Sequence, residues 1–417
     1  MTQWWSRLGD PLLVELIAAA QEVSPSITGA GARLAQARAA LTSAQAANLP
    51  ALDASVSAQR GVNSQSPTPA TLLQGSLNAS WELDIFGSNR AGAQAADARA
   101  RGAQAQWHEA RVSVAAETAS LYFNLRTCRR IQERVLADAA SRQETARLTG
   151  LTAQAGFSAP ASAALARASA AEGQARSRQQ QSQCDSLQKA LVALTAWPEA
   201  TLVQRLQAAP PVDTTAVMPV VPSVPAAVLT QRPDLYAAER DVAAASAEIG
   251  AAEAQRYPRL MLSGSVGTLS FSNISGTTDL NTWSVGPLAV SLPLFDGGRR
   301  KANIEAAQAR YVEAAAQYRA RARQAVREVE DAMQQLASAD ARRADAAQAS
   351  EGYAASFNAT QARYQAGAAS LPELEDVRRL TLAAQVALLQ LEQERSNAWI
   401  SLYRALGGGW SRSGDAP

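Results

Sequence analysis

Two proline-free stretches of this sequence are too long to be helices inside a compact globular domain. They cover residues 88–155 and 298–365 and are rich in Ala, Gln, Arg and Glu, which favour helix. At a rise of 1.5 Å per residue, each helix would span on the order of 100 Å. Such lengths are typical of coiled coils and helical repeats rather than of globular cores.

The last predicted helix, residues 372–406, carries the apolar spacing of a coiled coil. Steps of three and four residues alternate along the series Leu374, Val377, Thr381, Ala384, Leu388 and Leu391. The helices alone therefore fit a coiled-coil scaffold in the cytosol, which is one interpretation of the chain. Cys128 and Cys184 fall on different helices of one predicted hairpin, and we expect buried thiols there rather than a disulfide.

Four short segments contradict the scaffold interpretation because apolar and polar residues alternate along them. From Leu73 to Ile85 every odd position is apolar or glycine, and every even position is polar. The alternation predicts strands over residues 51–60, 72–85, 259–269 and 282–294, joined as two hairpins by loops at 61–70 and 270–281. The phase shifts by one residue at Gly286-Pro287, which indicates a bulge.

The predicted strands have the length and the two-faced character of membrane-spanning strands. Four strands cannot close a barrel, however, and an open sheet edge cannot face lipid. Neighbouring copies of the chain must therefore supply the remaining strands. A barrel that continues into long helices is a conduit rather than an enzyme.

An internal repeat gives the two halves of the chain the same order of elements. Leu83-Asp84-Ile85-Phe86 corresponds to Leu292-Pro293-Leu294-Phe295 at an offset of 209, and Gln154-Ala155-Gly156 to Gln365-Ala366-Gly367 at an offset of 211. We predict a first repeat over residues 1–202, an irregular proline-rich connector over 203–225 and a second repeat over 226–417. The helices are predicted at about 88–155 and 160–196 in the first repeat, and at about 298–365 and 372–406 in the second.

A series of motifs in a fixed order carries a family resemblance over essentially the whole chain. The motifs are Trp4-Trp5, the segment 81–87 (WELDIFG), the segment 231–235 (QRPDL), the segment 292–298 (LPLFDGG) and the segment 364–367 (YQAG). Together they resemble TolC-like outer-membrane factors, and more closely the OprM/NodT branch that serves resistance-nodulation-division (RND) efflux pumps. The resemblance implies a membrane α+β fold, in which a long periplasmic α-helical coiled-coil barrel joins a transmembrane β-barrel with four strands per protomer and twelve in a trimer.

The resemblance also implies a function and partners. The chain is expected to be the outer-membrane channel of a tripartite efflux pump, a passive gated conduit from the periplasm to the exterior. Its implied partners are two further copies in a homotrimer, a periplasmic adaptor (membrane-fusion) protein, an inner-membrane RND pump and outer-membrane lipid. The alternative transport role is the outer-membrane component of a type I protein-secretion system.

Three groups of residues are the candidate functional sites under this resemblance. A periplasmic gate is expected at Tyr364, Gly367, Leu371, Glu373 and Asp376, and adaptor-docking tips at Gln154, Gly156, Gln365 and Gly367. Three copies of Glu373 and Asp376 would form a negative ring that favours cations. The chain departs from its relatives at Ala369 and Pro372, so closure is expected to depend on Leu371 and the two carboxylates. Membrane-interface positions are expected at Trp81, Phe86, Trp283, Phe295, Arg299 and Arg300.

Other functional classes find no support in the sequence. A net charge of +2 with interspersed signs gives no footprint for nucleic acid. One His and two Cys give no metal cluster, no cofactor motif is present, and no catalytic motif is recognised. The outer membrane is the expected location, with most of the chain in the periplasm. We expect a signal peptide and a lipidated cysteine upstream of Met1, the alternative being a family member without a lipid anchor.

Overall fold

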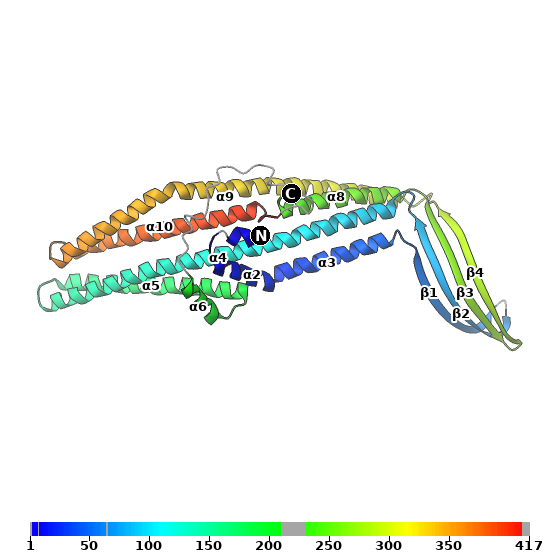
Figure 1. The fold of residues 1–417 in the computed structure, drawn as a ribbon, viewed down its shortest axis with the longest axis horizontal. Coiled ribbons are helices and arrows are strands. Elements are labelled where there is room, and N and C mark those ends of the chain that lie inside the picture. Colours follow the sequence, from blue (N-terminus) through cyan, green and yellow to red (C-terminus); the bar gives the residue numbers. More distant parts are fainter. Residues whose placement is uncertain (1, 7, 64–65, 210–230, 411–417) are drawn as a thin grey trace. The chain divides into compact units, whose positions relative to one another are not determined.

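A computed structural model describes residues 2–6, 8–63, 66–209 and 231–410 (Figure 1). The chain forms two compact units. The sheet unit comprises Ala30–Trp107 and Asp234–Ala322, and the helical unit comprises Met1–Gly29, His108–Pro233 and Arg323–Pro417. Helices α4 (Ser88–Gln154) and α9 (Arg299–Gln365) contribute to both units, and each is 67 residues long. The two long helices predicted from the absence of proline are therefore present.

The sheet unit contains one antiparallel sheet of four strands in the order β1-β2-β3-β4 (Figure 1). The strands are β1 (Ala51–Asn63), β2 (Ser66–Leu83), β3 (Arg259–Asn273) and β4 (Gly276–Ser291). They extend into both segments that we expected to be loops. Near the β3–β4 turn, Thr277 Oγ1 donates to Ser272 Oγ at 3.1 Å, so polar cross-strand pairs continue the ladder where the apolar alternation ends.

The register of the sheet places apolar residues on one face and hydroxyls and amides on the other. Leu77, Val266 and Trp283 form one cross-strand row, and Trp283 and Val285 are 79% and 85% exposed. On the opposite face, Ser265 Oγ and Ser284 Oγ lie 2.9 Å apart in a polar row. The alternation predicted from the sequence is therefore realised as two chemically distinct faces.

The predicted bulge in the last strand is confirmed. The register shifts between Leu262 and Gly264 on β3, so that Gly286 and Pro287 of β4 stand opposite the single residue Ser263. Pro287 has no N–H to give to the ladder, which is why the extra residue is accommodated at this position.

Alanine dominates the helical part of the sheet unit, where α3 (Pro25–Ala46) lies beside α4, and α8 (Pro233–Ala254) lies beside α4 and α9 (Figure 1). Ala95 and Ala98 of α4 and Ala244 of α8 form a buried cluster. A Cβ on Gly102 would come within 3.4 Å of Arg240 Cβ and 3.6 Å of the Ala237 carbonyl oxygen. Small side chains therefore let these backbones approach closely, as the Ala-rich composition predicts.

The helical unit has the larger apolar core. It contains α1 (Thr2–Ser6), α2 (Pro11–Val23), α5 (Pro160–Thr195), α6 (Glu199–Ala208), α10 (Leu371–Ala405) and the remaining parts of α4 and α9. Buried Asp10 caps α2 by accepting from the amides of Leu12 and Leu13, and it also accepts from the Tyr122 hydroxyl of α4. Trp5, Leu13, Leu16, Tyr122, Leu125, Leu191, Trp399 and Tyr403 are among the core residues.

The proline-rich connector was predicted wrongly at its start. Residues 199–208, of which we assigned 203–208 to the irregular connector, form helix α6. Pro198 precedes the helix, no proline lies inside it, and Leu202 and Leu206 are buried one turn apart. Residues 210–225 of the predicted connector lie outside the described residues.

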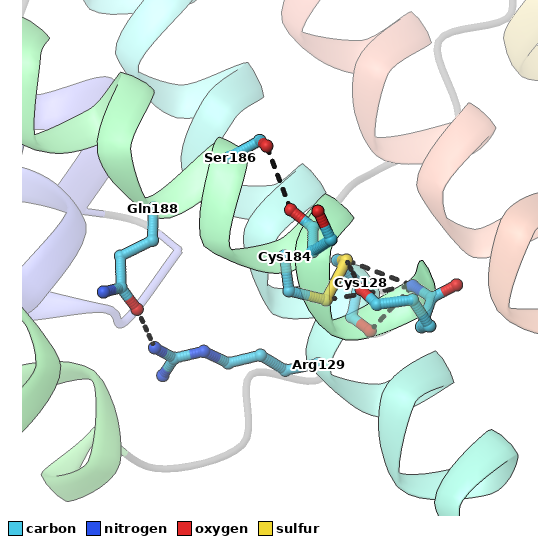
Figure 2. Close-up of a disulfide and its surroundings, with 7 residues drawn as sticks. Cys128, Arg129, Cys184, Ser186 and Gln188 are labelled. Carbon is cyan, nitrogen blue, oxygen red and sulfur yellow. Dashed lines mark hydrogen bonds between the residues drawn. A yellow bond between two sulfur atoms is a disulfide. The ribbon is translucent and has the colours of Figure 1, made fainter. Parts of the chain in front are cut away.

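The expectation of free thiols is wrong, because Cys128 of α4 and Cys184 of α5 form a disulfide (Figure 2). Their Cα atoms are 5.6 Å apart. The two cysteines are equally far in sequence from Gly156, so an antiparallel hairpin that turns there brings them to the same level. This equal spacing is the sequence signal that we did not use.

None of the described helices combines the length and the apolar character needed to cross a membrane.

Candidate functional site

Two helical hairpins of the helical unit, α4/α5 and α9/α10, end in turns of the same geometry. Gly156 and Gly367 adopt positive φ values of 79° and 76°. At the first turn, the Gly156 amide donates to Ala153 O at 3.1 Å and the Phe157 amide donates to Thr152 O at 2.8 Å. At the second turn, the amides of Gly367 and Ala368 make the equivalent hydrogen bonds, at 3.0 and 2.8 Å. This is the Schellman pattern, which requires a left-handed residue after the last helical turn. Gly156 and Gly367 are therefore needed to end the helices.

The predicted tip residues surround these turns but differ in what they expose. Gln154 and Gln365 are the last residues of α4 and α9, and both side chains are exposed. Phe157, which sequence reasoning did not single out, is 87% exposed at the first turn. The second turn has Ala368 at the equivalent position. The first turn therefore presents an aromatic side chain to solvent and the second does not.

The predicted gate residue Tyr364 lies at the contact between the two hairpins, and Leu371 is buried at the start of α10. The Tyr364 hydroxyl on α9 is 2.9 Å from Thr149 Oγ1 on α4. Leu371, the first residue of α10, is 5% exposed, and the preceding Ser370 caps α10 by accepting from the Glu373 amide at 3.3 Å. The Tyr364 hydrogen bond joins the second hairpin to the first close to both turns.

The predicted gate carboxylates are each paired with an arginine of the same chain. Glu373 Oε1 accepts from Arg363 Nη1 at 2.9 Å, and Asp376 Oδ1 accepts from Arg379 Nη2 at 3.1 Å. All four side chains are largely exposed, so each pair contributes little to stability. Arg363 and Arg379 reduce the negative charge that the sequence analysis assigned to this region.

Sequence reasoning missed a buried charged cluster close to the gate residues. Its charged members are Asp138 and Arg142 of α4 and Glu375 and Arg378 of α10. The four side chains are 7%, 7%, 16% and 2% exposed, respectively. The i, i+4 and i, i+3 spacings within each pair are visible in the sequence, but such spacings are usual on solvated helices and do not reveal burial.

The predicted membrane-interface aromatics divide into packed and exposed members, all in the sheet unit. Trp81 Nε1 donates to Asn48 O at 3.0 Å, and Phe86 stacks on Tyr257 with ring centroids 4.9 Å apart. Trp283 and Phe295 are 79% and 92% exposed. The stacked and hydrogen-bonded rings lie where the strands meet the helices, and the exposed rings are free to contact lipid or another chain.

The two arginines predicted at the membrane interface differ in exposure and in their side-chain partners. Arg299 is exposed, whereas Arg300 donates to Asp296 at 2.6 Å and both side chains of that pair are about one-fifth exposed. Asp296 also accepts from the backbone amides of Gly298 and Arg300. Arg300 therefore helps Asp296 to start α9, and Arg299 is the better placed of the two to reach a lipid phosphate.

Arg232 of the segment 231–235 has a structural role in the helical unit. Arg232 Nη1 donates to Ala405 O at 2.8 Å, at the end of α10, and Arg232 Nη2 pairs with Glu328 of α9 at 2.7 Å. A Cβ on Gly407 would lie 2.8 Å from Gln231 O. Arg232 thus satisfies a terminal helix carbonyl and connects three segments of the chain.

The described residues contain no group of three or more His, Cys, Asp or Glu side chains that could hold a metal ion. The structural features that can support a function are the two-faced sheet, the hairpin turns and the charged contacts between the hairpins.

Comparison with known proteins agrees with these features. Residues 16–196 and 224–408 match the family described as outer membrane efflux protein. The nodulation protein T of Rhizobium leguminosarum bv. viciae is 28% identical, over 99% of this chain and 85% of that protein. The solvent efflux pump outer membrane protein SrpC of Pseudomonas putida is 29% identical, over 97% of this chain and 87% of that protein.

Solved structures match over the whole fold. The outer-membrane channel OprN superposes with a TM-score of 0.86 at 28% identity, covering 98% of this chain and 93% of that chain. The outer membrane protein VceC from Vibrio cholerae superposes with a TM-score of 0.85 at 29% identity, covering 99% of this chain and 100% of that chain. The predicted TolC-like fold, outer-membrane location and efflux role are confirmed. The chain belongs to the outer membrane efflux protein family and is an outer-membrane efflux channel of the OprM/NodT type.

Proposed function

We propose that three copies of the chain close a single twelve-stranded barrel and form a passive, gated conduit. The observation that carries the proposal is the open sheet: among the described strands, β1 and β4 each have one neighbour, although the sheet has a continuous apolar face. Such edges are stable in lipid only when they pair. Mass measurement in mild detergent is expected to give about three times the 43.8 kDa of one chain, whereas a stable monomer would contradict the proposal.

The closed end of the conduit is assigned to the α9/α10 turn, with Tyr364, Gly367, Leu371, Glu373 and Asp376. Two observations support this assignment: the Tyr364–Thr149 hydrogen bond between the hairpins, and the burial of Leu371 at the start of α10. Three copies of Glu373 and Asp376 around one axis would attract cations, although Arg363 and Arg379 weaken that field.

The gate is tested by Glu373→Ala combined with Asp376→Ala in the assembled channel. Single-channel conductance in planar bilayers is expected to rise and cation selectivity to fall, because the constriction loses its carboxylates. Glu172→Ala is the matched control, since Glu172 is also an exposed carboxylate paired with an arginine of its own helix. Unchanged conductance and selectivity in a correctly assembled double variant would remove both residues from the gate.

The partners follow from the exposed turns. An inner-membrane RND pump would deliver substrate through a periplasmic adaptor, and the adaptor would contact the turns at Gln154, Gly156, Gln365 and Gly367. Among the described residues near either turn, Phe157 is the most exposed large apolar side chain, at 87%, which favours the first turn as the stronger contact. Trp283, Phe295 and Arg299 would face outer-membrane lipid. The conduit performs no catalysis in this proposal, and the pump selects the substrate.

The two-repeat organisation remains part of this proposal. The matching Schellman turns at Gly156 and Gly367 support it, as does the match of the family to two segments of the chain. The compact units do not coincide with the repeats, because each unit takes residues from both halves of the sequence.

A further inference from the structure

The apolar core of the helical unit ends, on the side of the first turn, at the Cys128–Cys184 disulfide. Its members on α4 run from Val112 to Cys128, and its members on α5 are Cys184 and Leu191. Between the disulfide and the turn, the buried positions of α5 carry only small side chains, namely Ala163, Ala166, Ser169, Gly173 and Ser177. Small side chains bury little apolar surface, so the disulfide holds the two helices together where the core stops.

Neither sulfur of the disulfide is open to another protein in the folded unit. Cys128 and Cys184 are 7% and 4% exposed, and the Gln180 side-chain nitrogen lies 3.1 Å from the first sulfur and 3.8 Å from the second. Leucines of α2 and α6 and aromatic rings of α10 complete the same core. Thiol–disulfide exchange requires a third sulfur to reach the reacting pair. The bond therefore forms before the core is complete.

The α4/α5 hairpin has the side-chain contacts that bring the two cysteines to one level. Gln180, Cys184 and Gln188 are spaced one turn apart along α5. The Gln180 side-chain amide donates to the Cys128 carbonyl oxygen at 3.4 Å, and Arg129 Nη2 donates to Gln188 Oε1 at 2.8 Å (Figure 2). All these residues belong to α4 and α5, so neither the N-terminal helices nor α10 is needed to pair the thiols.

We propose that the chain is a substrate of a periplasmic thiol oxidase, a protein with a redox-active disulfide, which forms the Cys128–Cys184 bond on the α4/α5 hairpin before α2 and α10 cover it. As an outer-membrane channel the chain passes through the periplasm, where disulfides form. Helix α10 lies after both cysteines in the sequence and contributes Trp399, Ile400 and Tyr403 to the core, so it docks on a hairpin that is already oxidised. This order does not depend on the proposed gate.

The exchange has two steps, and the charge next to each cysteine decides which cysteine acts first. Arg129 and Arg130 follow Cys128, whereas Asp185 follows Cys184. Positive charge favours the thiolate, which is the attacking form. The Cys128 thiolate attacks the oxidase disulfide and displaces one oxidase thiolate. The Cys184 thiolate then attacks the Cys128 sulfur of the mixed disulfide and displaces the second. Two protons and two electrons pass from the cysteines to the oxidase, which leaves as a dithiol.

The difference in reactivity is tested on the full-length chain unfolded in urea, with the neutral disulfide dithiodipyridine as the probe. Cys184→Ala retains Cys128, and Cys128→Ala retains Cys184, so each variant reports one thiol. The Cys128 thiol is expected to react about threefold faster at low salt, and the difference is expected to shrink at high salt. Equal rates at low salt would overturn the assignment of Cys128 as the first attacking thiolate.

The order of oxidation and core closure is tested on the purified oxidised channel. Dithiothreitol is added to the folded channel and to the channel in urea, and free thiols are counted with a maleimide reagent. Reduction of the folded channel is expected to be slower by at least about a hundredfold, because the reductant must wait for the core to open locally. Equal rates in the two conditions would show that the sulfurs are accessible after folding and would overturn the proposed order.

The oxidase itself is tested by following the full-length chain in cells with and without their periplasmic thiol oxidase. Without it, the oxidised fraction of newly made chain is expected to fall about tenfold, because uncatalysed disulfide formation is slow, and less chain is expected in the outer membrane. The double variant Cys128→Ala and Cys184→Ala is the matched control, and its amount in the outer membrane is expected to be the same in both cells. If the control also decreases, the oxidised fraction of the wild type alone decides. A fully oxidised wild-type chain in cells without the oxidase would overturn the proposal.

Discussion

The two hairpins of the helical unit have the same turn geometry but are held together differently. In α4/α5 the Cys128–Cys184 disulfide fixes the two helices covalently, beside the large apolar core (Figure 2). In α9/α10 the helices are joined by side-chain contacts, such as Arg395–Asp340 at 2.6 Å and Arg342–Glu394 at 2.7 Å. Both cysteines of the sequence are in the first hairpin, so the second has no covalent link.

This difference indicates which hairpin is the fixed one and which can move. A covalent link prevents α4 and α5 from sliding past each other, whereas ion pairs and hydrogen bonds break and re-form. The second hairpin also carries Leu371, Glu373 and Asp376 of the proposed gate. The contacts that join it to the first hairpin are polar near the turns, namely the Tyr364–Thr149 hydrogen bond and the ion pair of Glu375 with Arg142. We therefore expect the α4/α5 hairpin to be the frame of the proposed gate and α9/α10 to be its moving part.

The largest effect is expected when the covalent link of the first hairpin is removed by the double substitution Cys128→Ala and Cys184→Ala. The bond closes a loop with a sequence separation of 56, and its loss is expected to cost about 3 kcal/mol, or roughly a hundredfold in amide-exchange protection of α5. Hydrogen exchange of the assembled channel measures this, with α10 peptides from the same digest as the internal control. An equal loss of amide-exchange protection in α5 and α10 would show that the disulfide does not stabilise the first hairpin more than the second.

The next effect concerns the difference between the two turns. Phe157→Ala removes the exposed aromatic ring from the first turn and is expected to weaken adaptor binding about tenfold, as the loss of an interface hot spot does. Ala368→Ser at the equivalent position of the second turn is the control and is expected to have no effect. Binding of the adaptor from the same efflux system to the immobilised trimer gives both affinities. If the two variants bind equally well, the first turn is not the stronger contact.

A smaller effect is expected from the hydroxyl that joins the moving part to the frame. Tyr364→Phe removes the hydrogen bond to Thr149, worth about 1 kcal/mol, and is expected to raise the open fraction roughly fivefold. Tyr353→Phe is the control, since Tyr353 is a half-exposed tyrosine of the same helix. Single-channel recording of both variants provides the test, and identical recordings would exclude this hydroxyl from closure.

The smallest expected effect is a pH dependence of the thermal stability that arises from α4. His108 of α4 is the only histidine of the chain, and burial together with the neighbouring Arg111 lowers its pKa below the usual 6.5. The stability linked to His108 is therefore fully present above about pH 6.5 and decreases as the pH falls below it, because the unfolded chain binds the proton more readily. The thermal midpoint of the trimer is expected to drop between about pH 7.5 and about pH 5.5, and His108→Gln to reduce that drop. An identical drop in the variant would assign it to other groups.

The helices and strands of this channel could be predicted from the amino-acid sequence, because each depends on local periodicity. Proline-free Ala-rich stretches give α4 and α9, strict alternation gives two-faced strands, and a phase shift at Gly286-Pro287 gives the bulge. The glycines at the two turns were also visible, since ending a helix in this way needs a left-handed residue. The order of motifs was sufficient to identify the family.

The side chains that meet across helices could not be predicted in this way, because they depend on how the helices pack. The seam on α10 from Leu374 to Leu391 was predicted, but its second buried face, with Leu382 and Leu389, follows from the presence of α4. The Cys128–Cys184 bond, the Glu375–Arg142 ion pair and the close approach at Gly173 all depend on the relative level of antiparallel helices. Sequence periodicity describes one helix at a time, whereas a charge is buried or exposed according to what the neighbouring helix places against it.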